Sequence, residues 1–278
     1  MKTIAAEAFD PAGVVAELLD GGGAVRLPGV FDAATIREAG EIIRRETADA
    51  RETGSHFNRD EDDALQQRRV WNLLAHGRPF TDIVQHPRIV DSMRAFLGTD
   101  FVMGSICASR TMPGFRGQEP HVDYPYWDLY RTRSFPARIN ASFPLNAQAT
   151  ILIDPFTEDN GATAYLPGSQ KTLRYPTEED RFFDSCERMT GEPGDVVLFF
   201  GATWHCAMPN HTDQGRAGIL VEFLPKFVKP IEDLVGGLDP AFLETASPTL
   251  RQLLGFAYPW PSSPPHPPLG AEVEIATG

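Results

Sequence analysis

Residues 193–224 read PGDVVLFFGATWHCAMPNHTDQGRAGILVEFL. Two apolar runs in this stretch, 196–200 and 216–224, are rich in Val, Leu, Ile and Phe and are bounded by turn-forming residues, which predicts two β-strands. Residues 210–215 between them have the composition of a turn and predict a hairpin. His205 closes the first apolar region, where a buried imidazole needs a partner. The stretch therefore predicts strands that carry polar side chains into a β-rich interior.

A short upstream motif, HVDYPYW at residues 121–127, offers partners for His205. Side chains at positions i and i+2 of a strand point to the same face, so His121 and Asp123 are expected side by side. Two imidazoles and one carboxylate on one side of a metal ion leave its other positions open, as in non-haem Fe(II) oxygenases. We therefore predict that His121, Asp123 and His205 hold one metal ion. His211 is the competitor for His205, but it lies in the turn and is expected to be exposed.

Short β segments separated by Gly, Pro, Asn and Asp predict a β-rich core in the middle of the chain. The expected strands are 101–112, 119–127, 137–145, 148–154, 162–166, 196–200 and 216–224. Apolar residues at helical spacing, with Pro near the start and Gly at the end, predict helices before this core. The expected helices are 10–20, 33–50 and 87–97, with a short strand at 24–27 and further helical packing within 226–256. This order predicts an α+β fold with a mainly β core, a double-stranded β-helix (jelly-roll, cupin-like) braced by N-terminal and flanking helices.

The length of 278 residues is compatible with one domain, because β-rich domains of roughly 200–250 residues commonly fold as one unit. We predict a single domain over residues 1–278. Residues 10–98 are expected to form mostly helical support and a lid, 99–225 the jelly-roll core, and 226–278 a C-terminal helical segment with a Pro-rich tail. The charge-rich residues 51–68 predict a solvated loop, with a lid over a pocket as the alternative.

The composition argues against several classes of partner. The formal net charge is -13, and no basic run resembles a nucleic-acid or membrane patch. Cys107, Cys186 and Cys206 show neither metal-binding nor disulfide spacing, which favours reduced thiols in the cytoplasm. The first residues lack the apolar segment of a signal peptide, and about 18 consecutive apolar residues occur nowhere. We expect a cytoplasmic protein that acts on a small molecule, without nucleic acid or membrane, as a monomer or a homodimer.

Three stretches together resemble the phytanoyl-CoA dioxygenase-like family of Fe(II)/2-oxoglutarate-dependent oxygenases. They are HVDYPYW at 121–127, DPFTEDNGATAYLPGSQK at 154–171 and PGDVVLFFGATWHCAMPNHTDQGRAG at 193–218. The resemblance follows the order of elements over roughly residues 10–225. It implies Fe(II) as the metal, held by His121, Asp123 and His205, with 2-oxoglutarate as cosubstrate and O₂ as oxidant.

Arg216 is expected to begin the second strand of the hairpin and to point into the same interior as His205. A guanidinium there is costly without an anion, and its planar fork matches a carboxylate. The resemblance assigns it the C5 carboxylate of 2-oxoglutarate, and the alternative is a surface pairing with Asp213 or Glu222. A hydroxyl commonly supports this contact. The candidates are Thr157, Thr163 and Ser109.

Aromatic and basic side chains near the metal ligands are candidates for the substrate pocket. The aromatic candidates are Tyr124, Tyr126, Trp127 and Trp204, with ordinary core packing as an equal alternative. Arg131 and Arg138, with Arg133 between them, form a small basic cluster. An anionic substrate group is one hypothesis for this cluster, and a solvated loop is the other.

The resemblance implies oxidative decarboxylation of 2-oxoglutarate to succinate and CO₂, coupled to oxidation of an unactivated C–H bond. Asp123 fills a position that related halogenases leave to a halide, so hydroxylation, desaturation or ring formation is expected and chlorination is not. A natural-product intermediate is the expected substrate. One alternative is a zinc hydrolase, but the motifs contain no obvious Glu or His as its general base. The other is a non-catalytic jelly-roll that binds a small ligand.

Overall fold

A computed structural model describes residues 1–49, 65–123, 144–172 and 174–256. The strands are β1 (Lys2–Thr3), β2 (Ala24–Leu27), β3 (Gln67–Val70), β4 (Val102–Thr111), β5 (Ala147–Leu152), β6 (Ala164–Tyr165), β7 (Glu187–Arg188), β8 (Val196–Phe200), β9 (His205–Cys206) and β10 (Arg216–Leu224). The α-helices are α1 (Pro11–Leu19), α2 (Ala33–Glu46), α4 (Arg78–Val84), α5 (Pro87–Leu97), α7 (Phe182–Ser185), α8 (Pro240–Thr245) and α9 (Pro248–Leu253). Short 3-10 helices are η1 (Ala6–Ala8), η2 (Leu73–His76), η3 (Ser169–Thr172) and η4 (Glu178–Asp180).

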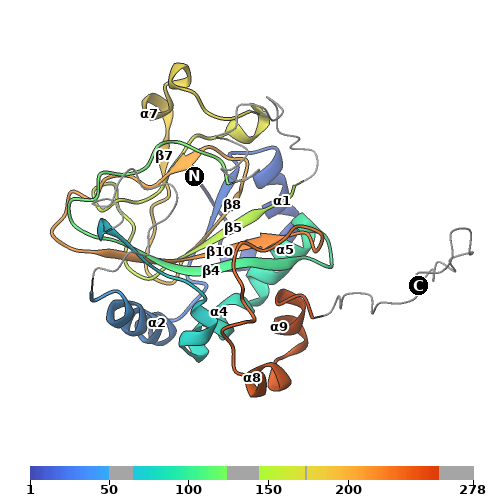
Figure 1. The fold of residues 1–278 in the computed structure, drawn as a ribbon. Coiled ribbons are helices and arrows are strands. Elements are labelled where there is room, and N and C mark those ends of the chain that lie inside the picture. Colours follow the sequence, from blue (N-terminus) through green and yellow to red (C-terminus); the bar gives the residue numbers. More distant parts are fainter. Residues whose placement is uncertain (50–64, 124–143, 173, 257–278) are drawn as a thin grey trace, which may run out of the picture.

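Two sheets organise the described part of the chain. The large sheet has the strand order β1-β2-β8-β5-β10-β4-β3, and a smaller one has the order β7-β6-β9. Apart from β1 with β2, neighbours in the large sheet are antiparallel. Helices α1, α2, α5 and α9 contact the large sheet, and Figure 1 shows α2, α4, α5 and α9 gathered along one side of it, away from β7. The predicted combination of helices with a large antiparallel sheet is confirmed, and in the described residues the sheets do not close into a barrel.

The two faces of the large sheet differ because side chains alternate along each strand. In β10, Ile219 and Val221 belong to the main hydrophobic core, which the helices complete. Arg216, Leu220 and Glu222 line a cavity on the opposite face. Burying each aliphatic side chain contributes roughly 1.5–3 kcal/mol, so the helix-covered face stabilises the fold while the other face is left for polar groups.

The predicted elements agree with the structure where the sequence is apolar. Strands 24–27, 196–200 and 216–224 have their predicted bounds, and helix 87–97 is α5. Helix α1 begins after the predicted cap, Asp10, whose carboxylate accepts hydrogen bonds from two backbone N–H groups of the first turn.

Three predicted features differ from the structure. Gln67–Val70 lie in and beside the stretch expected to be a loop, yet they form edge strand β3, antiparallel to β4. Residues 119–123 contribute one isolated bridge to His205 and no strand. The turn at 210–215 leads from β9 in the small sheet to β10 in the large one, so it does not join a hairpin.

Several predictions lie outside the described residues or stay predictions. The lid residues 51–64, most of strand 137–145, and the Pro-rich tail from 257 are outside them. The single-domain assignment over 1–278 stays a prediction.

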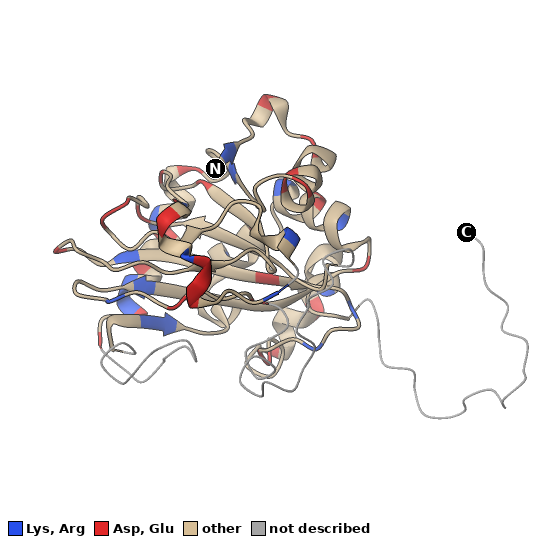
Figure 2. Ribbon diagram, turned by 90° about the horizontal axis from the view of Figure 1, so that it is seen from above, with Lys and Arg blue, Asp and Glu red and all other residues tan. Residues whose placement is uncertain are grey.

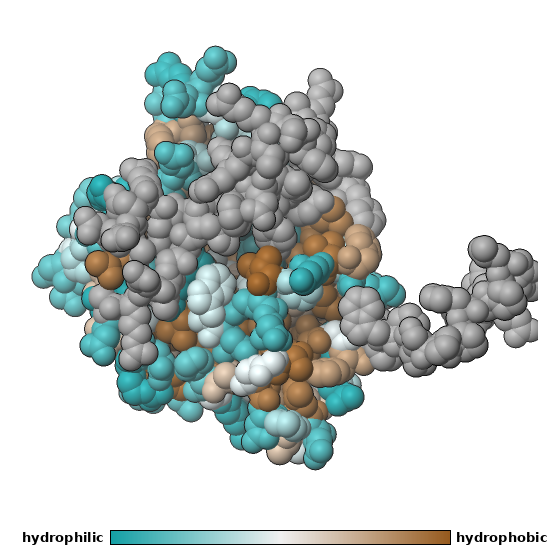
Figure 3. Space-filling view, in the orientation of Figure 1, coloured by the Kyte–Doolittle hydropathy of each residue, from teal (hydrophilic) through white to brown (hydrophobic). Residues whose placement is uncertain are grey.

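The surface of the described part carries both signs of charge. Figure 2 shows acidic and basic residues spread over helices, strands and loops. On the face seen in Figure 3, apolar side chains gather around α8 and α9 among hydrophilic ones. Cys107, Cys186 and Cys206 all lie in the described residues, and none of them forms a disulfide. None of the described helices has the length and apolar character needed to cross a bilayer.

Candidate metal centre

The backbones of His121 and His205 hold the two imidazoles together. The N–H of each residue donates to the C=O of the other, at 2.9 and 3.0 Å, in an isolated antiparallel bridge. The Asp123 N–H donates to the C=O of Gly201, just after β8, at 2.9 Å. Three main-chain hydrogen bonds therefore fasten the HVD segment to the end of β8 and to β9.

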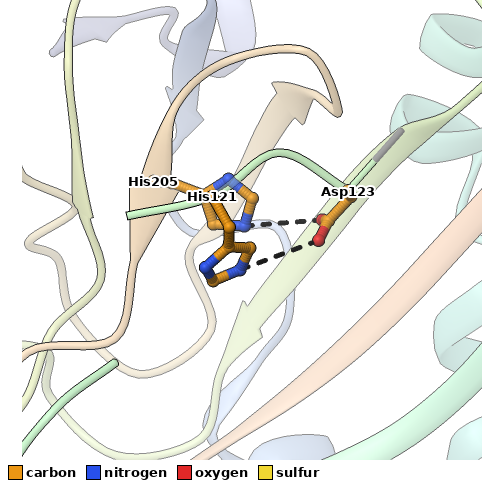
Figure 4. Close-up of side chains that lie close together, drawn as sticks. All are labelled: His121, Asp123 and His205. Atoms are coloured by element: carbon orange, nitrogen blue, oxygen red, sulfur yellow. Dashed lines mark ion pairs between the residues drawn. The ribbon is translucent and has the colours of Figure 1, made fainter. Parts of the chain in front are cut away.

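The side chains of His121, Asp123 and His205 converge on one point, as Figure 4 shows. Nε2 of His205 lies 3.4 Å from Oδ2 of Asp123, and Nε2 of His121 lies 3.9 Å from Oδ1. All three ligand atoms lie within 4.8 Å of one another. Ligand atoms about 2.1 Å from a shared ion are roughly 3.0–3.5 Å apart at common coordination angles. The donor set therefore fits one small cation after a slight contraction.

The second nitrogen of each imidazole is already used. Nδ1 of His121 lies 2.7 Å from the C=O of Glu119, and Nδ1 of His205 lies 2.9 Å from the C=O of Thr203. A carbonyl only accepts, so each Nδ1 carries the proton and donates, which leaves the Nε2 lone pair for a metal. Phe199 packs edge-on against His205 with ring centres 4.8 Å apart, and both imidazoles are buried. The rings are therefore fixed in the tautomer and the orientation of metal ligands.

Arg216 lies in the same cavity and is only 4% exposed. Its Nε donates to the C=O of Asn160 at 3.4 Å, its Nη2 donates to the C=O of Gly161, and the guanidinium lies 4.0 Å from the ring centre of Phe156. Burial lowers the pKa of Arg216 to about 10. Among the described residues no ion pair to this guanidinium is found, so neither acidic partner considered from the sequence holds it. A buried cation beside a metal-binding cluster suits an anionic ligand.

The hydroxyl candidates for this anion separate in the structure. Ser109 and Thr163 line the cavity, whereas Thr157 is exposed at the turn that Asn160 organises. Thr150 also lines the cavity and was missed. The two lining candidates remain open for the role.

The predicted substrate-pocket residues divide into two groups. Trp204 is not among the residues that line the cavity, and it is 2% exposed. Its Nε1 donates to the C=O of Arg174 at 2.9 Å, and the Arg174 guanidinium lies over the ring, 4.9 Å from its centre. Core packing is thus its role, because its polar edge is satisfied away from the cavity. The other candidates lie outside the described residues and stay predictions: Tyr124, Tyr126, Trp127, Arg131 and Arg138.

Sequence reasoning missed much of the polar cavity wall. The missed residues include Gln67, Arg69, Gln118, Gln148, Thr150 and Glu222. Glu222 was accessible from spacing, because residues two, four and six positions after Arg216 share its face of the strand. Gln67 and Arg69 carried no such signal, since their short strand has no apolar alternation.

Gln118 ties the metal-binding segments to the sheet. Its backbone N–H donates to the C=O of Ala207, beyond β9, at 2.8 Å, and its side-chain Oε1 accepts from the Ala207 N–H at 3.0 Å. Its Nε2 donates to Oε1 of Gln67 on β3 at 3.4 Å. The segment leading to His121 is therefore anchored on two sides.

Two imidazoles, a carboxylate and a buried arginine in one cavity against a large antiparallel sheet define a non-haem iron oxygenase. The family model described as phytanoyl-CoA dioxygenase (PhyH) matches residues 19–218, and the chain belongs to this family. The protein is therefore an Fe(II)/2-oxoglutarate-dependent dioxygenase, as the resemblance predicted.

Similar proteins include dioxygenases from fungi. Dioxygenase cdmA from Talaromyces verruculosus is 29% identical over 253 residues, which cover 87% of this chain and 82% of that protein. Dioxygenase af480 from Aspergillus fumigatus is 25% identical over 197 residues, which cover 68% of this chain and 59% of that protein. The aligned region thus spans less than two thirds of dioxygenase af480.

Solved structures share the fold. The epimerase SnoN in complex with Fe3+, alpha ketoglutarate and nogalamycin RO matches with a TM-score of 0.61 and 20% identity, over 83% of this chain and 94% of that one. The alpha ketoglutarate dependent carbocyclase SnoK from nogalamycin biosynthesis matches with a TM-score of 0.59 and 18% identity, over 84% and 92%. At these identities the likeness concerns the fold.

Proposed function

We propose that the protein hydroxylates an unactivated C–H bond of a small organic molecule, an intermediate of natural-product biosynthesis, in the cytoplasm, with release of succinate and CO₂. The observation that carries the proposal is the joint placement, in one cavity, of the His121, Asp123 and His205 cluster and the buried Arg216 guanidinium. The cluster fits a metal ion, and the Arg216 guanidinium fits the far carboxylate of a dicarboxylic cosubstrate.

His121, Asp123 and His205 would hold Fe(II), which with 2-oxoglutarate and O₂ supplies the oxidising chemistry. The protein's own part is positional. Backbone carbonyls keep both imidazoles in the Nδ1-protonated form, and the carboxylate of Asp123 adds the negative charge that a divalent ion favours. Arg216 would take the C5 carboxylate in a two-point contact, supported by the hydroxyl of Ser109 or Thr163.

Asp123 is the reason for proposing hydroxylation. Its carboxylate lies against both imidazoles, within 3.4 and 3.9 Å, and thereby occupies the side of the cluster that an exogenous anion would need. Oxygen transfer is the outcome that this filled position favours, and halide transfer is disfavoured.

The proposal extends to the architecture, in which the two sheets would form the two halves of a double-stranded β-helix. The cavity is lined from the large sheet by Leu220 and from the small sheet by His205. The chain crosses from one sheet to the other between β9 and β10, as jelly-roll strands do. This arrangement would place His205, on β9, and Arg216, on β10, on strands of opposite sheets.

The test starts with the full chain under anaerobic conditions. Fe(II) and 2-oxoglutarate are added, O₂ is admitted, and succinate is measured with and without a panel of small molecules. We expect succinate that depends on both Fe(II) and 2-oxoglutarate. Succinate no higher than in the metal-free control would overturn the proposal, and hydrolysis supported by Zn²⁺ alone would favour a hydrolase.

Arg216→Ala tests the cosubstrate site by itself. The 2-oxoglutarate affinity should fall roughly tenfold or more, because a charge-assisted two-point contact is lost, while Fe(II) binding is kept. Arg37→Ala, on the exposed face of α2, is the matched control and should behave as wild type. Unchanged cosubstrate affinity in Arg216→Ala would remove Arg216 from this role.

A further inference from the structure

The cavity has an apolar side that neither the metal ligands nor Arg216 occupy. Across the large sheet, Cys107 on β4 pairs with Leu220 on β10, and both line the cavity. Trp71, which also lines the cavity, directly follows edge strand β3 and continues this row beside Cys107. Burial raises the pKa of the Cys107 thiol to about 11, so all three side chains of the row are uncharged.

The charged side chains beside this row are engaged within the cavity wall. The Arg69 guanidinium lies over the ring of Trp71, 5.6 Å from its centre, and its Nη1 donates to Sγ of Cys107 at 3.7 Å. Glu222 accepts a hydrogen bond from the Asn146 amide at 2.8 Å. Arg69 and Glu222 each make a further interaction besides these. Because both charged groups are already engaged, the binding that this part of the wall offers is apolar contact.

Ile231 continues the apolar surface at the mouth of the cavity. It lines the cavity and yet is 46% exposed, on the segment that follows β10. The N–H groups of Ile231 and Glu232 donate to the C=O of Gly104, on the same strand as Cys107, at 3.1 and 3.3 Å. An exposed isoleucine is thus held over β4 by main-chain hydrogen bonds.

Glu232 fastens both sides of this mouth. Its Oε1 accepts from the Asn72 N–H at 2.6 Å, and its Oε2 accepts from the Ile106 N–H on β4 at 2.7 Å. Asn72, the neighbour of Trp71, has a left-handed backbone with φ of 47°, which is uncommon for a residue other than glycine. One carboxylate therefore holds the chain beside Trp71 and beside Ile231 against the strand between them.

The apolar surface also extends toward the metal ligands. Leu220 pairs with Thr150 on β5, and Thr150 pairs with Val197 on β8. Phe199, two residues further along β8 and on the same face, lines the cavity. Its ring packs against the imidazole of His205 with ring centres 4.8 Å apart. Apolar side chains are therefore present both beside a metal ligand and at the mouth.

We propose that these side chains bind an uncharged, apolar part of the substrate, so that the substrate carries a hydrocarbon chain or ring that reaches from the oxidised C–H bond to the mouth. We call them the apolar track: Phe199, Leu220, Cys107, Trp71 and Ile231. Ile231 is a specificity-determining residue, and Glu232 is a positioning residue. The inference rests on the proposed function, because it takes the substrate to lie in the cavity that holds the metal ligands.

The experiment uses the full chain loaded with Ni(II) and 2-oxoglutarate, which assembles the site without turnover. Dissociation constants of the linear primary alcohols butanol, hexanol and octanol are measured by saturation-transfer NMR, each beside the diol that carries a second hydroxyl at its other end. In wild type the affinity should rise about fourfold for each added CH₂, which is the effect of burying a methylene. Octanol should bind about tenfold or more tightly than its diol, because the second hydroxyl would lie against apolar side chains.

Ile231→Asn tests the mouth by itself. It should weaken octanol binding about tenfold, because apolar contact is lost and a polar group is buried, and it should leave butanol, which is too short to span the track, as in wild type. Ile231→Val should keep most of the octanol affinity. Phe227→Asn is the matched control, since Phe227 is 65% exposed on the same segment and is not among the described residues that line the cavity.

Glu232→Gln tests the positioning role. A glutamine can accept at only one of the two N–H groups, so the mouth should loosen and the dependence of affinity on chain length should flatten. Affinities for Ni(II) and 2-oxoglutarate should stay as in wild type. A steep dependence on chain length in Glu232→Gln would remove Glu232 from this role.

The outcomes separate this inference from the proposed function. Wild-type affinity that does not depend on chain length, diols that bind as tightly as the alcohols, or full octanol affinity in Ile231→Asn would overturn the apolar track while Ni(II) and 2-oxoglutarate binding stand. An equal loss in Phe227→Asn would show adsorption to the outer surface and would overturn it as well. Failure of wild type to bind Ni(II) and 2-oxoglutarate would instead overturn the proposed function.

Discussion

At the scale of single residues, Asp123 carries the charge on which the metal cluster depends. It is the only carboxylate in a set whose other two members are imidazoles. Asp123→Asn keeps the shape and removes the charge, so affinity for Mn(II), a redox-stable probe, should fall by more than about 100-fold, beyond the roughly 10–100-fold that loss of an outer partner of a ligand causes. Asp184→Asn, an exposed acid on α7, is the control. Equal Mn(II) affinity in titrations of the two variants would contradict the assignment.

The buried charge of Arg216 is expected to favour cosubstrate binding and to lower the stability of the apo protein. Burial of its guanidinium disfavours the charged form, which is why its pKa is lowered, and folding bears that cost. Arg216→Met removes the charge, so the free energy of unfolding of the apo protein should stay level or rise by about 1 kcal/mol. In metal-loaded wild type, 2-oxoglutarate at 100 times its Kd should add about 2.7 kcal/mol, and in a variant that binds it tenfold or more weakly the same concentration should add at most about 1.4 kcal/mol. Equal stabilisation of Arg216→Met and wild type by 2-oxoglutarate in denaturant titrations would refute this.

At the scale of elements, the turn before β8 depends on Asp195. The buried carboxylate accepts from the Gly29 N–H at 2.9 Å and from the Glu192 N–H at 3.0 Å, and it lies 3.7 Å from a guanidinium nitrogen of Arg26 on β2. Asp195→Ala leaves these donors unsatisfied, so the free energy of unfolding should drop by about 1–3 kcal/mol in urea titrations. Metal affinity should not change, because the ligands lie at the other end of β8. A stability equal to wild type would show that water replaces the carboxylate.

Asp213→Ala is the matched control for this turn. Asp213 is exposed in the turn before β10, so its removal should leave the free energy of unfolding within about 0.5 kcal/mol of wild type.

Which elements the sequence predicts depends on what their side chains face. Strand β10 was predicted residue for residue because its helix-facing positions, such as Ile219 and Val221, are apolar and its β-branched content is high. Strand β3 was missed, since it is an edge strand whose inward residues, Gln67 and Arg69, face a polar cavity instead of a core. Alternation signals a strand only when one of its faces is apolar.

Part of the candidate site follows from local sequence spacing, and the rest depends on contacts between distant segments. Spacing within one strand predicted that His121 and Asp123 lie together, and the structure adds His205 through a backbone bridge that no local pattern specifies. Trp204, next to His205, does not line the cavity, because its indole N–H donates to the Arg174 carbonyl instead. Whether an aromatic beside a ligand enters the pocket is decided by long-range packing, which a single sequence does not show.

At the scale of the whole molecule, the formal net charge of -13 opposes the approach of a dianionic cosubstrate. Figure 2 shows charged residues distributed over the described part. Their summed charge repels the cosubstrate at long range, whereas Arg216 attracts it only near the cavity that it lines. The Debye length falls from about 30 Å at 10 mM to about 8 Å at 150 mM ionic strength. A chain of this length has a radius of gyration of about 19 Å, so the whole charge is felt only at low salt.

The association rate of 2-oxoglutarate with the Ni(II)-loaded protein should therefore rise severalfold between 10 and 150 mM salt, as screening removes the net repulsion. Stopped-flow measurement of the association rate against salt concentration is the test. A 2-oxoglutarate rate that falls with salt would mean that the local field of Arg216 and Arg69 at the cavity outweighs the net charge. Attraction would then be built into the cavity itself, and the acidic surface would have no part in choosing between anion and cation.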